Sequence, residues 1–208
     1  MEQIFDKIPK SSVEYVRGLI SSENIIFKIK KSRRTKHGDF SIKKNGLVII
    51  TINEDLNDYR FLITLIHEIS HYFSVKNYGV HIKPHGIEWK NTFKKLLLPI
   101  INNDIFPDQI LKFLSNYAKN PKASTDSHSD LSIALNNYNI NKSKYVFNLN
   151  NGEIFRASNK RKYKMIKKLR KRYECMDVSS KKLYLFNPNA VVEEIIYCLL
   201  YTSPSPRD

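Results

Sequence analysis

The residues of this chain best suited to chemistry are two histidines and a glutamate in the segment HEISH at residues 67–71. They fall within residues 58–78, whose apolar residues recur at helical spacing. Side chains four positions apart share one face of a helix, so His67 and His71 can bind the same metal ion. Glu68 would then stand close enough to take a proton from a water molecule at that ion. The pattern therefore predicts the water-activating centre of a zinc peptidase.

The simpler alternative is a helix whose histidines are merely packed or solvated. Its apolar residues would anchor it in a core, Asn57 or Asp58 can cap its start, and Gly79 suits its end. Buried polar groups without partners are costly, so such a helix needs a reason to carry two histidines and a glutamate. A bound metal supplies that reason.

A catalytic zinc site needs three protein ligands and an open position, so a third ligand must come from outside this helix. The candidates that follow it are His81, His85 and Glu88. Pro84 favours an extended backbone, and a second helix is predicted over residues 87–101. We favour His85, which would lie at the mouth of that helix, and Glu88 is the rival. Three imidazoles suit zinc best among the available metals.

Together, HExxH at residues 67–71 and HGxxW at residues 85–89 resemble the SprT-like domain of bacterial SprT and eukaryotic Spartan proteases. The segments RRTKHGDF at 33–40 and IITIN at 49–53 resemble strands of that family, and NPKAS at 120–124 resembles a linker of its bacterial members. The similarity extends over about residues 9–194.

This resemblance implies a zincin-like α+β catalytic domain over residues 1–125, with an active-site helix packed on a small β-sheet. It implies one catalytic Zn²⁺ held by His67, His71 and His85, with Glu68 as the general base. The substrates would be proteins associated with DNA or crosslinked to it.

The elements around the predicted centre are a short helix, three strands and a further helix. The patterns place them at residues 13–20, 25–31, 39–43, 47–53 and 108–118. Asn45-Gly46 indicates a hairpin turn between the last two strands. Residues 126–130 are expected to form a polar loop with His128 exposed to solvent.

A second module is expected over residues 141–197, as a ribbon-like pair of β-hairpins. One hairpin would join residues 145–149 to 153–156, and the other 172–178 to 182–186. Many SprT-like proteins carry a four-cysteine zinc ribbon here, but Cys175 lacks the cysteine partners for one, so we expect no structural zinc. Aromatic side chains would form the core instead: Tyr145, Phe147, Phe155, Tyr173, Tyr184 and Phe186.

Positive charge is concentrated in this module, where nine of the thirteen residues 160–172 are Lys or Arg and none is acidic. A solvated surface is the alternative, but this density favours nucleic-acid binding, mostly through phosphates. Tyr163 and Tyr173 could stack on bases. A second basic cluster lies near the N-terminal strands and contributes the candidate contacts Arg33, Arg34 and Lys36. The candidate contacts in residues 160–172 are Lys160, Arg161, Lys162, Lys164, Lys167, Lys168, Arg170, Lys171 and Arg172.

The remaining sequence features favour a cytoplasmic protein that binds no membrane. No apolar run is long enough for a membrane span, and the N-terminus begins with an acid rather than with the basic start of a signal peptide. Residues 198–208 resemble a translated sequencing adapter, and we expect them to be an artefact rather than part of the fold.

Two other functions stay open at this point. One is a nucleic-acid-binding module with a structural metal site. The other is a regulatory metallopeptidase that cleaves one specific partner. Glu68 argues against the first, because a purely structural metal site needs no general base.

Overall fold

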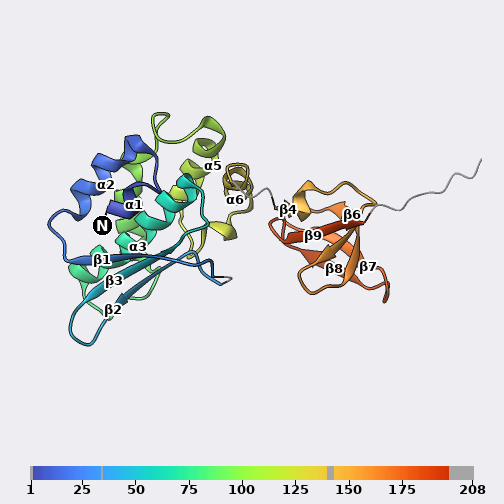
Figure 1. The fold of residues 1–208 in the computed structure, drawn as a ribbon, viewed down its shortest axis with the longest axis horizontal. Helices are drawn as coiled ribbons and strands as arrows, with labels where there is room; N and C mark the ends of the chain where they lie inside the picture. Colours follow the sequence, from blue (N-terminus) through green and yellow to red (C-terminus); the bar gives the residue numbers. More distant parts are fainter. Residues whose placement is uncertain (1, 34, 140–142, 197–208) are drawn as a thin grey trace, which may run out of the picture. The chain divides into compact units, whose positions relative to one another are not determined.

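The computed structural model describes residues 2–33, 35–139 and 143–196, and the chain divides into two compact units at residues 140/141 (Figure 1). Arg34 and the expected artefact at 198–208 lie outside the described residues. Helices and sheets both occur, as an α+β fold requires.

The first unit contains a three-stranded sheet and six α-helices among its described residues. These are α1 (Glu2–Phe5), α2 (Val13–Ile20), β1 (Ile25–Lys30), β2 (Gly38–Ile42), β3 (Val48–Asn53), α3 (Asp58–Tyr78), α4 (Ile87–Leu97), α5 (Asp108–Lys119) and α6 (Ser129–Asn136). Single 3₁₀ turns cover Lys10–Ser12, Leu98–Ile100 and Thr125–Ser127. The predicted polar loop at 126–130 is wrong, since α6 begins within it.

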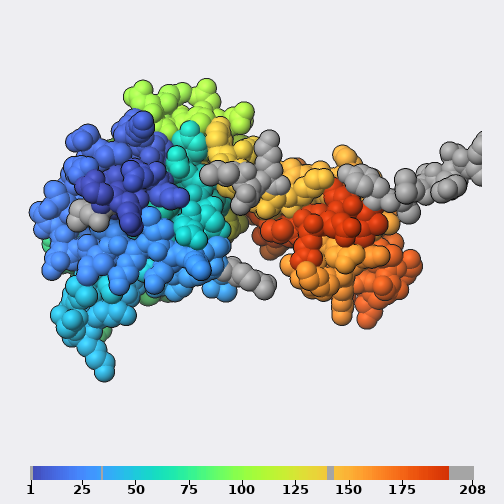
Figure 2. Space-filling model, in the orientation of Figure 1, coloured from blue at the N-terminus to red at the C-terminus, as the bar shows by residue number. Residues whose placement is uncertain are grey.

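The sheet has the order β1-β3-β2, with β1 parallel and β2 antiparallel to β3. Gly46 adopts the left-handed φ of 79° that the β2–β3 turn needs. This turn projects from the surface of the first unit (Figure 2). The sheet leaves β2 at an edge, and α3 packs against both β2 and β3.

Helix α3 is the centre of the core because residues 60–70 are buried on every side. Helix α4 packs along it through Trp89 and Phe93. A helix buried all round is held by tertiary contacts rather than by an amphipathic stripe. It therefore gives its histidines a rigid support.

Two polar residues in the first turns of α3 bind the chain that follows α5. Asn57 caps the helix by accepting from the Arg60 amide at 3.0 Å, and it donates to the Leu135 carbonyl at 2.8 Å. The buried Arg60 guanidinium donates to Asp126 at 2.5 Å and to the Ser132 carbonyl at 3.1 Å. These bonds fix residues 125–136 on α3.

Replacing Asn57 by Ala should destabilise the first unit by about 1–3 kcal/mol, because it removes the cap and the hydrogen bond that the side chain donates to the Leu135 carbonyl. Asn57→Ser should recover about 1 kcal/mol by restoring the cap. Trp89 is the single tryptophan of the chain, so urea unfolding followed by its fluorescence reports on this unit alone. A cost below about 0.5 kcal/mol for Asn57→Ala would contradict this assignment.

The described residues of the second unit form one antiparallel sheet of six strands. They are β4 (Lys144–Tyr145), β5 (Ile154–Ala157), β6 (Lys162–Lys168), β7 (Tyr173–Asp177), β8 (Leu183–Phe186) and β9 (Val191–Ile196), in the order β4-β9-β5-β6-β7-β8. The predicted β7–β8 pair is confirmed. The predicted hairpin of 145–149 with 153–156 is wrong: β4 pairs with β9, and Val146–Asn148 form a 3₁₀ turn whose amides bond to Ala190 and Pro188.

The core of this unit is only partly the expected aromatic cluster. Phe155 and Tyr173 are buried, and Phe147 and Phe186 pack against them from half-buried positions. Tyr163 is also buried, on the inward side of β6. The expectation that Tyr163 and Tyr173 stack on bases is therefore wrong, because neither ring is accessible.

Candidate metal centre

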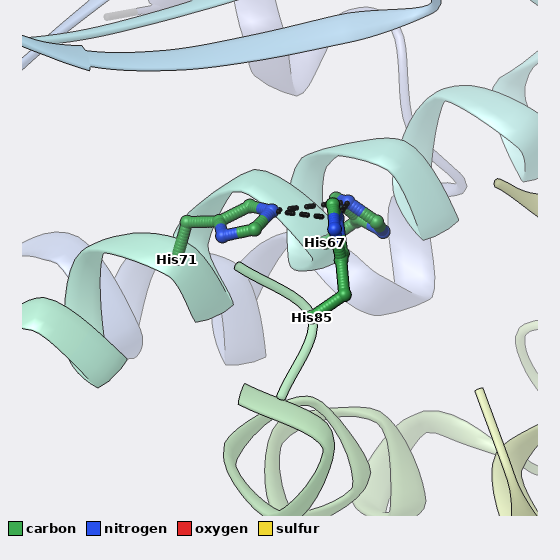
Figure 3. Close-up of side chains that lie close together, drawn as sticks. All are labelled: His67, His71 and His85. Carbon is green, nitrogen blue, oxygen red and sulfur yellow. Dashed lines mark hydrogen bonds between the residues drawn. The ribbon is translucent and has the colours of Figure 1, made fainter. Parts of the chain in front are cut away.

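Three imidazole nitrogens meet at one point of the first unit (Figure 3). His67 and His71 project from one face of α3, and His85 reaches them from the loop before α4. The Nε2 atom of His67 lies 3.0 Å from that of His85 and 3.2 Å from that of His71, and the third separation is 3.1 Å.

These three nitrogens cannot all form hydrogen bonds with one another. Each Nε2 either carries a hydrogen or presents a lone pair, so at least two of the three have the same role. At least one of the three close pairs is therefore repulsive. A cation at the centre removes the conflict because all three nitrogens then point lone pairs at it. In tetrahedral zinc sites with Zn–N bonds near 2.05 Å the nitrogens are ~3.3 Å apart, close to the spacing here.

The surroundings favour the neutral imidazoles that a metal needs. Burial, and then the neighbouring His71 and His85, hold the pKa of His67 well below its usual value. Burial and His85 lower the pKa of His71 to about 4, and burial lowers that of His85. Protons therefore do not compete for these nitrogens near neutral pH.

His85 is held by an unusual backbone and by a ring beneath it. Its φ is 59°, in the left-handed region that side chains other than glycine rarely adopt. Trp89, on the first turn of α4, is fully buried with its ring centroid 4.6 Å from that of His67 and 4.7 Å from that of His85. Phe93 stacks on Trp89 with ring centroids 5.0 Å apart, and its ring also lies 5.8 Å from that of His67. The aromatic pair forms the floor of the cluster.

Glu68 lies beside the histidines and is almost completely buried. Burial, and then the charge of Asp39, raise its pKa to about 8, against the lowering effect of Arg33 and Lys36. A divalent cation on the imidazoles would favour the carboxylate. Gly38, the first residue of β2, touches this carboxyl so closely that a Cβ on it would lie 2.5 Å from Oε1.

The cluster opens into a cleft of roughly 430 Å³. One wall is the edge of β2 with the residues before it, 35–40, and the floor holds the three histidines and Glu68. Residues 123–126 line the cleft too, from the segment that Arg60 fixes on α3. No local pattern of residues predicted that this segment would line the cleft.

The rival ligands lie elsewhere. His81 is exposed, Glu88 is half-buried in the first turn of α4, and neither belongs to the group of close ligand atoms found among the described residues. His128 is half-buried, and its Nδ1 accepts from the Leu131 amide at the start of α6.

The basic residues proposed for nucleic acid have different surroundings in the two units. Arg33 is engaged within the first unit, where it donates to Asn53 at 2.7 Å and to Thr51 at 3.0 Å. Lys36 pairs with Asp39 at 2.7 Å. In the second unit all nine basic residues at 160–172 are exposed, and two of them pair with acids: Lys160 with Glu193 and Lys167 with Glu174.

Two further side chains of the cleft were not anticipated, His37 and Asp126. They share a hydrogen bond of 2.7 Å across 89 positions of sequence. A lone histidine and an aspartate in a polar segment carry no local signal, so only the folded chain reveals them.

Residues 2–102 match the sequence profile of the SprT-like family. This segment belongs to the SprT-like family. The resemblance seen in the sequence is confirmed over these residues, which include the three histidines and Glu68. Membership implies a metal-dependent domain, and the imidazole cluster supplies donors that fit one. Residues 123–126 of the cleft and the whole second unit lie outside the match.

No curated protein matches the chain. Among the helices that the structure describes, none has the length and apolar character needed to cross a membrane.

The contact between Gly38 and Glu68 in the SprT-like segment can be tested by adding a single methyl group. Gly38→Ala should destabilise the first unit by about 1–3 kcal/mol, because the methyl overpacks a buried site. Adding Glu68→Ala should recover part of the loss, since two of the three closest atoms belong to Glu68.

Gly18→Ala is the matched control, because Gly18 has open space around it on α2. It should be neutral or stabilising by up to about 1 kcal/mol. Urea unfolding followed by Trp89 fluorescence measures all three variants. Equal stabilities of the Gly38 and Gly18 variants would contradict the close approach.

Proposed function

We propose that the first unit is a zinc-dependent peptidase. The observation that carries the proposal is the convergence of three neutral imidazoles beside a buried carboxyl at the floor of an open cleft. Three nitrogen ligands leave a fourth position for water or substrate, as catalytic zinc sites do. The match of residues 2–102 to the SprT-like family also supports it, because that family is associated with metallopeptidase-like domains.

His67, His71 and His85 would hold the zinc. When bound, zinc acts as a Lewis acid that makes a water molecule more acidic and polarises a carbonyl oxygen. Imidazole ligands suit it, and the burial that keeps these rings neutral also keeps them ready to bind.

Glu68 performs the proton transfers. Its carboxylate accepts a proton from the attacking water and delivers it to the nitrogen of the leaving amine, so the carboxylate is regenerated in each cycle. Gly38 and the packing around α3 fix the position of this carboxyl. Its burial strengthens every electrostatic interaction that it makes.

The edge strand β2 is suited to hold the substrate. Its inner edge pairs with β3, and no strand among the described residues pairs with its outer edge. Residues 38–40 of this strand line the cleft. An extended peptide could add to this edge through main-chain hydrogen bonds, which would present a carbonyl to the floor of the cleft.

Glu68→Gln is the decisive variant because it keeps the shape of the side chain and removes its basicity. We expect one zinc per chain in both the wild type and the variant, measured by elemental analysis after gel filtration. Cleavage of fluorescein-labelled casein should fall by at least about a hundredfold. Zinc binding without any cleavage that depends on Glu68 would instead favour a binding module with a structural metal.

The second unit supplies a DNA-binding surface in this proposal. We use the name basic hairpin for residues 160–172, which form the basic part of the β6–β7 hairpin. They comprise β6 and the turns on either side of it, the second of which leads into β7. Its strand alternates exposed lysines with buried Tyr163 and Met165. The Leu169 amide bonds to the Arg172 carbonyl at 2.8 Å, so Arg170 and Lys171 lie at an exposed tip. The substrates would then be proteins bound or crosslinked to DNA.

Neutralising the tip of the basic hairpin should weaken DNA binding and its dependence on salt. For Arg170→Gln with Lys171→Gln, the slope of log K against log[salt] should drop by up to about 1.8 on duplex DNA. Fluorescence anisotropy of a labelled duplex over a salt series measures it. Lys181→Gln with Lys182→Gln, in another exposed turn of the same unit, is the control of equal charge. Equal effects of the two double variants, or none, would contradict binding by this hairpin.

A further inference from the structure

Strand β8 exposes a large apolar surface at an edge of the second unit's sheet. Leu183 and Leu185 are 60% and 62% exposed, and Tyr184 between them is 37% exposed. One edge of β8 pairs with β7, and no strand among the described residues pairs with the other. Proteins usually protect such an edge with charges, proline or a bulge, because it attracts further strands. Residues 183–186 contain no charge and no proline, and their pairing with β7 is regular.

The backbone of β8 presents hydrogen-bonding groups at this open edge. The Asp177 amide donates to the Lys182 carbonyl at 2.9 Å, which places a bonded pair at the start of the strand. Bonded and non-bonded pairs alternate along an antiparallel ladder. The backbone of Tyr184 is therefore directed to β7, whereas Leu183 and Leu185 turn their amides and carbonyls outward. Since each residue has one donor and one acceptor, an added strand could form about four main-chain hydrogen bonds with these two leucines.

The side chains of the two leucines lie on the face of the sheet that is turned away from the core. Leu183 is paired with Met176 and Leu185 with Glu174, and none of these four belongs to the buried cluster of this unit. Glu174 is engaged with Lys167 at 3.7 Å on the same face. A strand added to β8 would place every second side chain beside the leucines. A fitting partner strand therefore carries apolar residues at alternate positions.

Positive charge lies at both ends of this apolar edge. Lys181 and Lys182 are exposed in the turn before β8. At the other end, the β7–β8 register places the exposed Arg172 beside Asn187, one strand in from the edge. The acid nearest to the lysines, Asp177, is buried, and its carboxylate accepts from two backbone amides of the turn at 2.9 Å. A fitting partner strand therefore carries acidic residues at its two ends.

The same charges argue against two other occupants of the edge. A second copy of the chain, paired antiparallel through β8, would bring its own Lys181 and Lys182 to the end that holds Arg172, so like charges would meet at both ends. Duplex DNA could contact the basic side chains, but its phosphates would leave the two leucines and the open backbone groups unused. An acidic extended peptide matches the charges, the leucines and the backbone together.

We propose that the outer edge of β8 binds an extended, acidic segment of a partner protein as a further strand of the sheet. Apolar side chains of the segment pack on Leu183 and Leu185, and carboxylates at its ends pair with Lys181, Lys182 and Arg172. The basic hairpin and this protein-binding edge adjoin at Arg172. The inference does not depend on the proposed peptidase activity.

The probe is a fluorescein-labelled peptide, DDVTVTVDD, added to the full chain carrying Glu68→Gln so that no cleavage occurs. Fluorescence anisotropy should show saturable binding. It should be about tenfold weaker when Leu183→Thr and Leu185→Thr are added, because two apolar cross-strand contacts are lost. Threonine suits a strand, so the sheet should keep its melting temperature. Val191→Thr, at an exposed apolar residue of β9, is the control and should bind like its parent.

A charge variant tests the ends of the edge. Lys181→Gln with Lys182→Gln should weaken peptide binding by about fivefold at low salt, and the difference should disappear near 1 M salt, where charges are screened within about 3 Å. Lys94→Gln with Lys95→Gln, at exposed positions of α4, is the control of equal charge and should have little effect. The charge-reversed peptide KKVTVTVKK should not bind.

Amide hydrogen exchange shows where the peptide lies. The amides of Leu183 and Leu185 should exchange at least about tenfold more slowly with DDVTVTVDD bound, because they gain partners. The amide of Tyr184, already directed to β7, should change less. The peptide DDVPVPVDD, which lacks two main-chain donors, should give no protection. Protection confined to residues 38–42 would place the peptide on β2 instead and overturn the inference.

Four further results would also overturn it. One is the absence of saturable binding of DDVTVTVDD, and another is equal binding by the parent and the leucine variant. A third is a dimer in analytical ultracentrifugation that dissociates in the leucine variant, because a second copy would then occupy the edge. The fourth is a loss of about tenfold in the affinity of the leucine variant for a labelled DNA duplex, which would assign the edge to the DNA surface.

Discussion

Three imidazole nitrogens held 3.0–3.2 Å apart form a contact that no choice of tautomer can satisfy. The rest of the first unit accounts for how the chain maintains it. Residues 60–70 of helix α3 are buried on every side, so the backbone that carries His67 and His71 is held in place. Trp89 blocks the space beneath the rings, and His85 reaches them from a left-handed backbone. A cation that binds the folded state alone would offset these costs and stabilise the unit by mass action.

The same helix also connects the metal cluster to the opposite wall of the cleft. Its first turns carry Asn57 and Arg60, which bind residues 125–136, and its middle carries His67, Glu68 and His71. A shift of α3 would therefore move Glu68 and the far wall of the cleft together. One buried helix thus positions both the floor and the far wall of the cleft, and the site proposed here would be preorganised by it.

The parts of this structure that the sequence predicted are those with a local signal. Helical periodicity and the flanking cap and glycine located α3 at residues 58–78, and the position of His85 at the start of the next predicted helix favoured it over His81. The parts that it missed depend on distant contacts. Residues 126–130 looked like a polar loop, but Asp126, in the turn before α6, pairs with Arg60 and His37, which lie 66 and 89 positions away in the sequence. In the second unit the sequence suggested a hairpin of residues 145–149 with 153–156, but β9 pairs with both β4 and β5.

The basic hairpin carries its positive charge on the exposed face of a packed strand. A strand packed on one face buries every second residue, so β6 places Tyr163 and Met165 inside and leaves Lys162 and Lys164 outside. The buried tyrosines cannot stack on bases, and the accessible groups are ammonium and guanidinium ions. Such groups contact phosphates, which are the same at every position of a nucleic acid. A surface of this kind would bring a peptidase to DNA without selecting a sequence, and the choice of substrate would then rest with the cleft of the first unit.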